Sequence, residues 1–148
     1  MDVSATYIFH APRAHVWALL INPEIIAGCL PGCESMDALD KDTYKATLTV
    51  GVAAITGRYE GTVRMTDKRK PSSYTLVVEG QGKPGFVKGS ASISLTENDN
   101  GTKTTVSVTG SAQVGGTIAR VGQRLIGSVS KMMMDRFFVC LQERAANS

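Results

Sequence analysis

The side chains with the greatest chemical reactivity in this chain are three cysteines and two histidines. Cys29 and Cys33 lie four positions apart around a Leu-Pro-Gly turn, and Cys140 lies far downstream. Structural zinc sites need four nitrogen or sulfur ligands in closely paired spacings, which these residues do not provide. Redox pairs favour a C-x-x-C spacing at a helix start, where the helix dipole lowers the thiol pKa. We therefore expect no metal site and reduced thiols, with Cys29 serving as a small buried apolar residue.

Candidates for catalysis are equally sparse. His10 and His15 lie near an expected strand-to-helix junction, and no companion motif marks either of them as an acid or base. Gly80 to Gly85 fit G-x-G-x-x-G by letter, but a dinucleotide site needs a helix after this loop, and here an alternating strand pattern follows. We interpret that segment as a hairpin loop and expect no catalytic residues.

The composition is that of an ordinary globular protein. Hydrophobic residues make up 43% and charged residues 20% of 148 residues, and the net charge of +3 is spread along the chain, so nucleic acid binding is not indicated. The length fits one domain over residues 1–148. The N-terminus lacks a basic segment followed by an apolar run, and no run of about 18 apolar residues occurs. We expect a cytoplasmic protein that does not span a membrane.

The first third of the chain predicts a strand followed by two short helices. Tyr7 to Phe9 are strand-like, and Pro12 suits the start of a helix that runs to Ile21. Asn22-Pro23 breaks that helix and begins a second one, which Pro31-Gly32 ends because proline lacks an N–H and glycine accepts left-handed geometry.

From Tyr44 onward the apolar residues alternate with polar ones, as in strands with one buried face. The alternation covers residues 44–50, 58–66, 91–95 and 105–109, and the Asn-Gly step before residue 102 is a strong hairpin signal. These segments predict an antiparallel meander.

After Gly115-Gly116 the spacing of apolar residues becomes helical, from Thr117 to Arg144. The whole pattern predicts an α+β helix-grip fold: a curved antiparallel sheet of about six or seven strands wrapped around a long C-terminal helix, with two short helices after the first strand. Gly122 falls within the expected helix on its apolar face, so its missing side chain either leaves space over the sheet or admits a large neighbour such as Trp17 or Tyr59.

Several segments resemble the CoxG-like family of carbon monoxide dehydrogenase subunits. They are Val16-Trp17, Asn22-Pro23-Glu24, Cys29 to Glu34, Gly57 to Gly61, Gly85 to Ala91, and Val114 to Gly122. The resemblance covers nearly the whole chain in the right order. It implies the START-like, birch-allergen-like helix-grip superfamily, which includes polyketide cyclases and lipid transport proteins, and a cavity for a hydrophobic ligand between the sheet and the terminal helix.

The resemblance also implies a partner and a ligand. In aerobic carbon monoxide oxidisers a family member helps a molybdenum hydroxylase to associate with the membrane and handles the quinone that receives its electrons. By resemblance, the ligand is a menaquinone-like, ubiquinone-like or other isoprenoid lipid, with a possible peripheral place at the inner face of the cell membrane. The short polar end after residue 141 predicts no firm anchoring. Other molybdenum hydroxylases share the family, so the partner's substrate stays open.

Our leading hypothesis is a non-catalytic protein that binds a hydrophobic molecule and serves such a hydroxylase. The predicted ligand-binding wall comprises Leu30, Leu48, Tyr59, Val63, Val78, Phe86 and Val108 on the sheet side, with Gly122, Leu125, Val129 and Met133 from the helix. Two alternatives stay open. One is an assembly or docking factor that uses Arg120, Arg124 and Lys131, and the other is a cyclase-like or hydrolase-like enzyme of the same superfamily.

Overall fold

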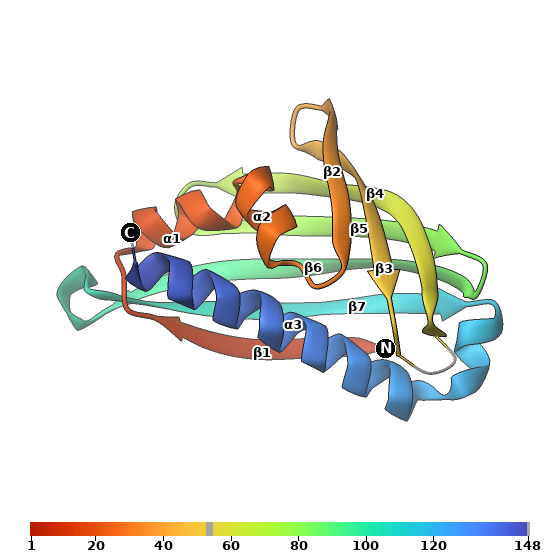
Figure 1. The fold of residues 1–148 in the computed structure, drawn as a ribbon. Helices are drawn as coiled ribbons and strands as arrows, with labels where there is room; N and C mark the ends of the chain where they lie inside the picture. The colour runs from red at the N-terminus through yellow and green to blue at the C-terminus, as the bar shows by residue number, and fades with distance from the viewer. Residues whose placement is uncertain (53–54, 148) are drawn as a thin grey trace.

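A seven-stranded antiparallel sheet curves around a long helix in the computed structural model, which describes residues 1–52 and 55–147 (Figure 1). The strands are β1 (Asp2–Phe9), β2 (Cys33–Asp40), β3 (Thr43–Val50), β4 (Gly57–Arg69), β5 (Ser73–Gly82), β6 (Gly85–Asn98) and β7 (Lys103–Gly115). The helices are α1 (Arg13–Leu20), α2 (Pro23–Cys29) and α3 (Gln123–Ala146). The predicted helix-grip fold class is confirmed.

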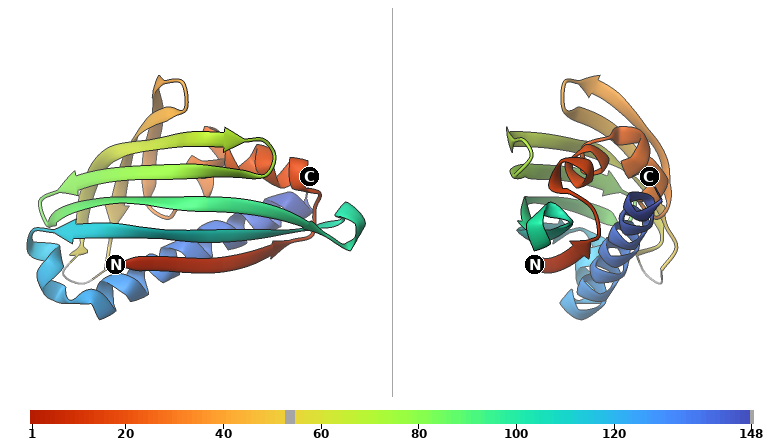
Figure 2. Two further views of the ribbon diagram at one scale, coloured as in Figure 1. Left: turned by 180° about the vertical axis from the view of Figure 1, so that it is seen from behind. Right: turned by 90° about the vertical axis from the view of Figure 1, so that its left-hand side faces the viewer.

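The sheet is a meander that the first strand closes at one side. Its order is β1-β7-β6-β5-β4-β3-β2, so every neighbouring pair except β1 and β7 is also consecutive in sequence. Inward-facing positions such as Val106 and Val108 on β7 are buried, and serines and threonines occupy most of the positions between such residues. This alternation is what an antiparallel sheet with one wet face requires. Figure 2 shows, from the end of the sheet, how the strands bend round toward α3.

The two short helices form where the sequence predicts them. The Asn22 side chain caps α2 by accepting a hydrogen bond from the Glu24 backbone N–H at 3.0 Å, and Pro23 occupies the first turn. Gly32 follows α2 with a φ of 77°, a conformation that favours glycine. Both helices pack beside α3 at one end of the sheet and extend the cover over its concave face (Figure 1).

The predicted continuous helix from Thr117 to Arg144 is wrong at its start. Residues Thr117–Val121 form a 3₁₀ turn, and α3 begins only after Gly122, which has a φ of 92° and a ψ of 151°. Gly122 is exposed, and a Cβ there would meet nothing within 4 Å. It therefore breaks the helical path and creates no space over the sheet.

The prediction of reduced thiols is also wrong for two of the three cysteines. Cys29, at the end of α2, forms a disulfide with Cys140 of α3, and their Cα atoms lie 5.5 Å apart. The reason is tertiary: α2 packs against the second half of α3, which brings together residues 111 positions apart in sequence. Cys33 is free, and its thiol donates to the Ser35 backbone carbonyl at 3.4 Å.

Two apolar clusters hold α3 on the sheet. The larger cluster lies under α1, α2 and the C-terminal half of α3, where Trp17, Phe9 and Leu141 are almost completely buried. Phe138 of α3 stacks on Tyr7 of β1 with ring centroids 4.2 Å apart. The smaller cluster is centred on Ile55, Ile118 and Val129 near the start of α3. The candidate site lies between the sheet and the helices that these clusters hold in place.

Candidate functional site

A cavity of about 380 Å³ lies between the concave face of the sheet and the helices. Its floor contains residues of all seven strands, with β1 and β2 contributing one residue each, and its roof contains residues of all three helices. The floor residues are Val3, Met36, Leu48, Val63, Met65, Tyr74, Leu76, Val78, Val87, Gly89, Ser90, Ala91, Ile93, Val108, Gly110, Ser111 and Ala112, and the roof and its edge are formed by Leu20, Ile26, Leu30, Met133, Met134, Phe137 and Phe138. None of these residues carries a charge.

Small residues on β6 and β7 lower the floor. In the sheet register Gly89 pairs with Ala112, and Ala91 pairs with Gly110. A Cβ on Gly110 would lie only 2.7 Å from the Cα of Ala91, and a Cβ on Gly89 would lie 2.8 Å from the Cβ of Ala112. The close approach of these backbones excludes larger side chains at both glycines. The larger apolar residues of β4 and β5 continue the same rows across the sheet, so the floor is deepest toward β7.

The roof is built from flexible and aromatic side chains of α3. Met133, Met134, Phe137 and Phe138 follow one another around the helix, and all four contribute to the lining. Unbranched methionine side chains adapt to the shape of an apolar partner. The disulfide at Cys140 holds α2, with its lining residue Ile26, against this helix.

Six of the predicted wall residues lie together in this lining. They are Leu30, Leu48, Val63, Val78, Val108 and Met133. Whether they bind a ligand stays a prediction, but the structure brings them to one apolar space.

The other five predicted wall residues lie outside the lining. Tyr59, Leu125 and Val129 belong to the smaller apolar cluster, and the Tyr59 hydroxyl donates to the Ile55 backbone carbonyl at 2.7 Å. Gly122 is at the exposed start of α3, where the backbone breaks. The helix therefore reaches the cavity about one turn later than the sequence pattern predicts.

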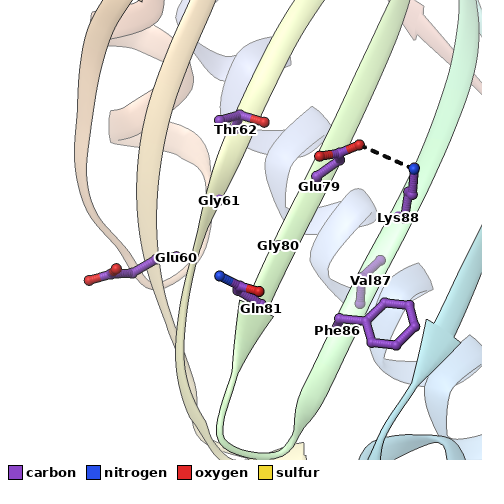
Figure 3. A pocket seen from close by; sticks show the side chains of 9 residues that line it. All are labelled: Glu60, Gly61, Thr62, Glu79, Gly80, Gln81, Phe86, Val87 and Lys88. Carbon is purple, nitrogen blue, oxygen red and sulfur yellow. Dashed lines mark ion pairs between the residues drawn. The ribbon is translucent and has the colours of Figure 1, made fainter.

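Phe86, the fifth of these residues, faces the opposite side of the sheet from the cavity. It is 47% exposed on the outer face of β6, and its neighbour Val87 points inward instead. Because side chains alternate along a strand, an error of one position moves a residue to the other face. Phe86 borders a shallow polar hollow of about 350 Å³ over β4, β5 and β6, where Lys88 and Glu79 form an ion pair of 3.6 Å (Figure 3).

Several lining residues were missed by sequence reasoning. Met65, Leu76, Val87 and Ile93 lie in phase with neighbouring apolar positions, so strict alternation could have found them. No sequence signal marks Tyr74, which faces the cavity although it stands at the start of β5.

The described lining offers little for acid–base chemistry. Tyr74 is its only titratable side chain, and burial raises the pKa of this phenol above its usual value. His10 and His15 lie outside the lining, and within residues 1–52 and 55–147 no three His, Cys, Asp or Glu side chains gather in a way that could hold a metal ion. In the same described part of the chain, no helix combines the length and apolar character needed to cross a bilayer.

Comparisons with known proteins agree with this architecture. A conserved protein from Geobacillus kaustophilus has a solved structure that superposes with a TM-score of 0.96 at 36% identity, over 100% of this chain and 97% of that one. A START superfamily protein from Mycobacterium smegmatis gives 0.76 at 11% identity, over 99% of this chain and 97% of that one. The Zhui aromatase/cyclase from Streptomyces sp. R1128 gives 0.72 at 14% identity, over 99% and 93%. The last two likenesses show the fold alone.

No curated protein matches the sequence. The sequence profile of the carbon monoxide dehydrogenase protein CoxG matches residues 8–146. The chain is therefore a member of the CoxG family of carbon monoxide dehydrogenase subunits, with a START-like helix-grip fold suited to a hydrophobic ligand.

Proposed function

We propose that this protein is a non-catalytic carrier whose cavity holds a neutral hydrophobic molecule, a quinone or a similar isoprenoid lipid, for a molybdenum hydroxylase such as carbon monoxide dehydrogenase. The observation that carries the proposal is the uncharged cavity of about 380 Å³ between the sheet and α3. The family name supports the association with the dehydrogenase.

The size of the cavity limits what it can enclose. A dry apolar cavity of about 150 Å³ is enough to hold benzene. A space of about 380 Å³ therefore matches a two-ring head group or a short isoprenoid segment, and a long polyisoprenoid tail would extend beyond it. Each enclosed CH₂ group contributes about 0.8 kcal/mol, so a ligand with about ten apolar carbons gains about 8 kcal/mol before the entropic cost of association.

The lack of charge in the lining selects against ions. A carboxylate moved into this space would lose its hydration with no lysine or arginine of the lining to compensate it. The cavity therefore favours neutral lipids and quinones over fatty acid anions.

The alternative docking role finds weaker support in the structure. Arg120 and Arg124 are exposed near the start of α3, but Lys131 is already paired with Asp135 at 2.9 Å. A docking factor with an incidental cavity would bind its partner equally well whether the cavity were filled or open.

The test is to fill the cavity from its floor. Ala91 faces inward, so Ala91→Phe places an aromatic ring in the space, whereas the matched control Ser92→Phe adds the same ring to the exposed outer face of the same strand. Purified wild type, Ala91→Phe, Ser92→Phe and Phe86→Ala are extracted with organic solvent, and quinones and other isoprenoid lipids are measured by mass spectrometry.

We expect wild type and both outer-face variants to carry such a lipid and Ala91→Phe to carry at least tenfold less. Equal occupancy in Ala91→Phe, or a wild type that neither carries lipid nor takes up an added prenylated naphthoquinone, would contradict the proposal. If partner binding survives in a folded Ala91→Phe that has lost its lipid, the docking role is favoured instead.

A further inference from the structure

We propose that the Tyr74 hydroxyl is the polar anchor of the cavity and donates a hydrogen bond to a carbonyl-type acceptor on an otherwise apolar, neutral ligand. This inference rests on the ligand-carrying function proposed above. It adds the ligand's orientation, because the acceptor would lie at the end of the cavity next to α1, with the apolar remainder extending toward the start of α3.

The position of Tyr74 is unusual among the tyrosines of the described chain. Its side chain lines the cavity although the residue is only 4% exposed, and its hydroxyl makes no hydrogen bond with the described residues. By contrast, the Tyr7 hydroxyl donates to Asp135 at 2.7 Å and the Tyr59 hydroxyl donates to the Ile55 carbonyl at 2.7 Å. Tyr74 therefore presents a polar group where the fold itself supplies no partner.

A buried hydroxyl without a partner is costly. Leaving such a group unsatisfied costs about 1–3 kcal/mol, and phenylalanine would fill the same space without that penalty. Burial also raises the pKa of Tyr74, so the phenol stays protonated and able to donate at neutral pH. A hydroxyl that is kept neutral and unpaired beside an apolar space is suited to an acceptor that the ligand brings.

Trp17 adds a second unpaired donor to the same corner. Its indole ring meets the Tyr74 ring edge-on with centroids 5.5 Å apart, and the buried indole Nε1 has no hydrogen-bond partner among the described residues. The other lining hydroxyls do not compete: Ser90 and Ser111 are exposed, and they alternate with the inward-facing Ala91 and Gly110. The corner thus offers donors but no cation, which matches a ketone, quinone or ester oxygen and disfavours a carboxylate.

The experiment compares two probes that differ only in the acceptor. One is 2-methyl-1,4-naphthoquinone carrying a single prenyl group, and the other is the trimethylnaphthalene of the same shape, in which methyl groups replace both carbonyl oxygens. Their dissociation constants are measured by equilibrium dialysis for wild type, Tyr74→Phe and the control Tyr59→Phe, which removes a hydroxyl outside the lining. Quenching of Trp17, the only tryptophan, reports whether the quinone binds beside Tyr74.

We expect wild type and Tyr59→Phe to prefer the quinone, and Tyr74→Phe to bind it about 5- to 100-fold more weakly while binding the hydrocarbon unchanged. If Tyr74→Phe keeps the preference for the quinone, the anchor is refuted and the carrier function stands. If Tyr74→Phe loses both probes equally, the ring packs rather than anchors, and the inference fails. If wild type binds neither probe, the carrier function itself fails.

Discussion

Breaking the disulfide between Cys29 and Cys140 should destabilise this protein strongly. The bond joins positions 111 residues apart, so it removes a large part of the conformational freedom of the unfolded chain. The chain-entropy relation gives about 4.7 kcal/mol for a loop of about 100 residues, and native disulfides commonly contribute about 2–5 kcal/mol. We expect reduction to lower the free energy of unfolding by about 3–5 kcal/mol. At about 2–4 °C per kcal/mol for a chain of this size, the melting temperature should fall by about 10–15 °C.

The assay is urea unfolding followed by circular dichroism, with and without a dithiol reductant. The double variant Cys29→Ala/Cys140→Ala should unfold at the same lower urea concentration under both conditions, because it has no bond to reduce. Cys33→Ser is the matched control, since Cys33 is free, and it should keep the full response to the reductant.

Two results would refute this reasoning. Oxidised and reduced wild type could unfold at the same midpoint, in which case the bond does not constrain the unfolded chain. Alternatively, Cys33→Ser could lose the response to reductant, in which case the pairing of cysteines is different from the one described.

Two further predictions concern the start and the flank of α3. Gly122→Ala should destabilise the protein by about 1 kcal/mol because of the positive φ, whereas Gly127→Ala inside the helix should stabilise it by up to about 1 kcal/mol; stabilisation by both, measured by thermal unfolding, would mean that the helix continues through Gly122. Hydrogen bonds from Lys131 and Tyr7 lower the pKa of Asp135, so their stabilising contribution is complete above the ordinary carboxyl value of 3.8 and is lost as the pH falls through the lower folded value. Urea midpoints should therefore fall more on acidification in wild type than in Asp135→Asn, and equal falls would show that this carboxylate is not linked to stability.

The sheet could be predicted from the sequence because its signal is local. Apolar and polar residues alternate along β3, β4 and β7, which is enough to place Leu48, Val63 and Val108 on one face. The phase of β6 could not be predicted in the same way. Phe86 and Val87 are adjacent and both apolar, and only the pairing of Gly82 with Gly85 at the hairpin decides which of them faces inward.

The errors at α3 have a different physical cause. Apolar residues recur with helical spacing on both sides of Gly122, so periodicity does not reveal that the backbone turns there. The disulfide gave no signal either, because Cys29 and Cys140 approach only after α2 has packed on α3. Both features depend on tertiary contacts that a pattern within one segment does not contain.

The origin of the cavity also changes once the structure is considered. The space does not come from a missing side chain on the helix, since Gly122 is exposed and lies outside the lining. It comes from the floor, where Gly89, Ala91 and Gly110 keep β6 and β7 low. Glycine within a strand costs about 0.5–1 kcal/mol relative to alanine, and an unfilled floor also deprives α3 of packing. A cross-link that contributes several kcal/mol between α2 and α3 offsets such losses without filling the space, so the disulfide and the small residues of the floor serve the same open cavity.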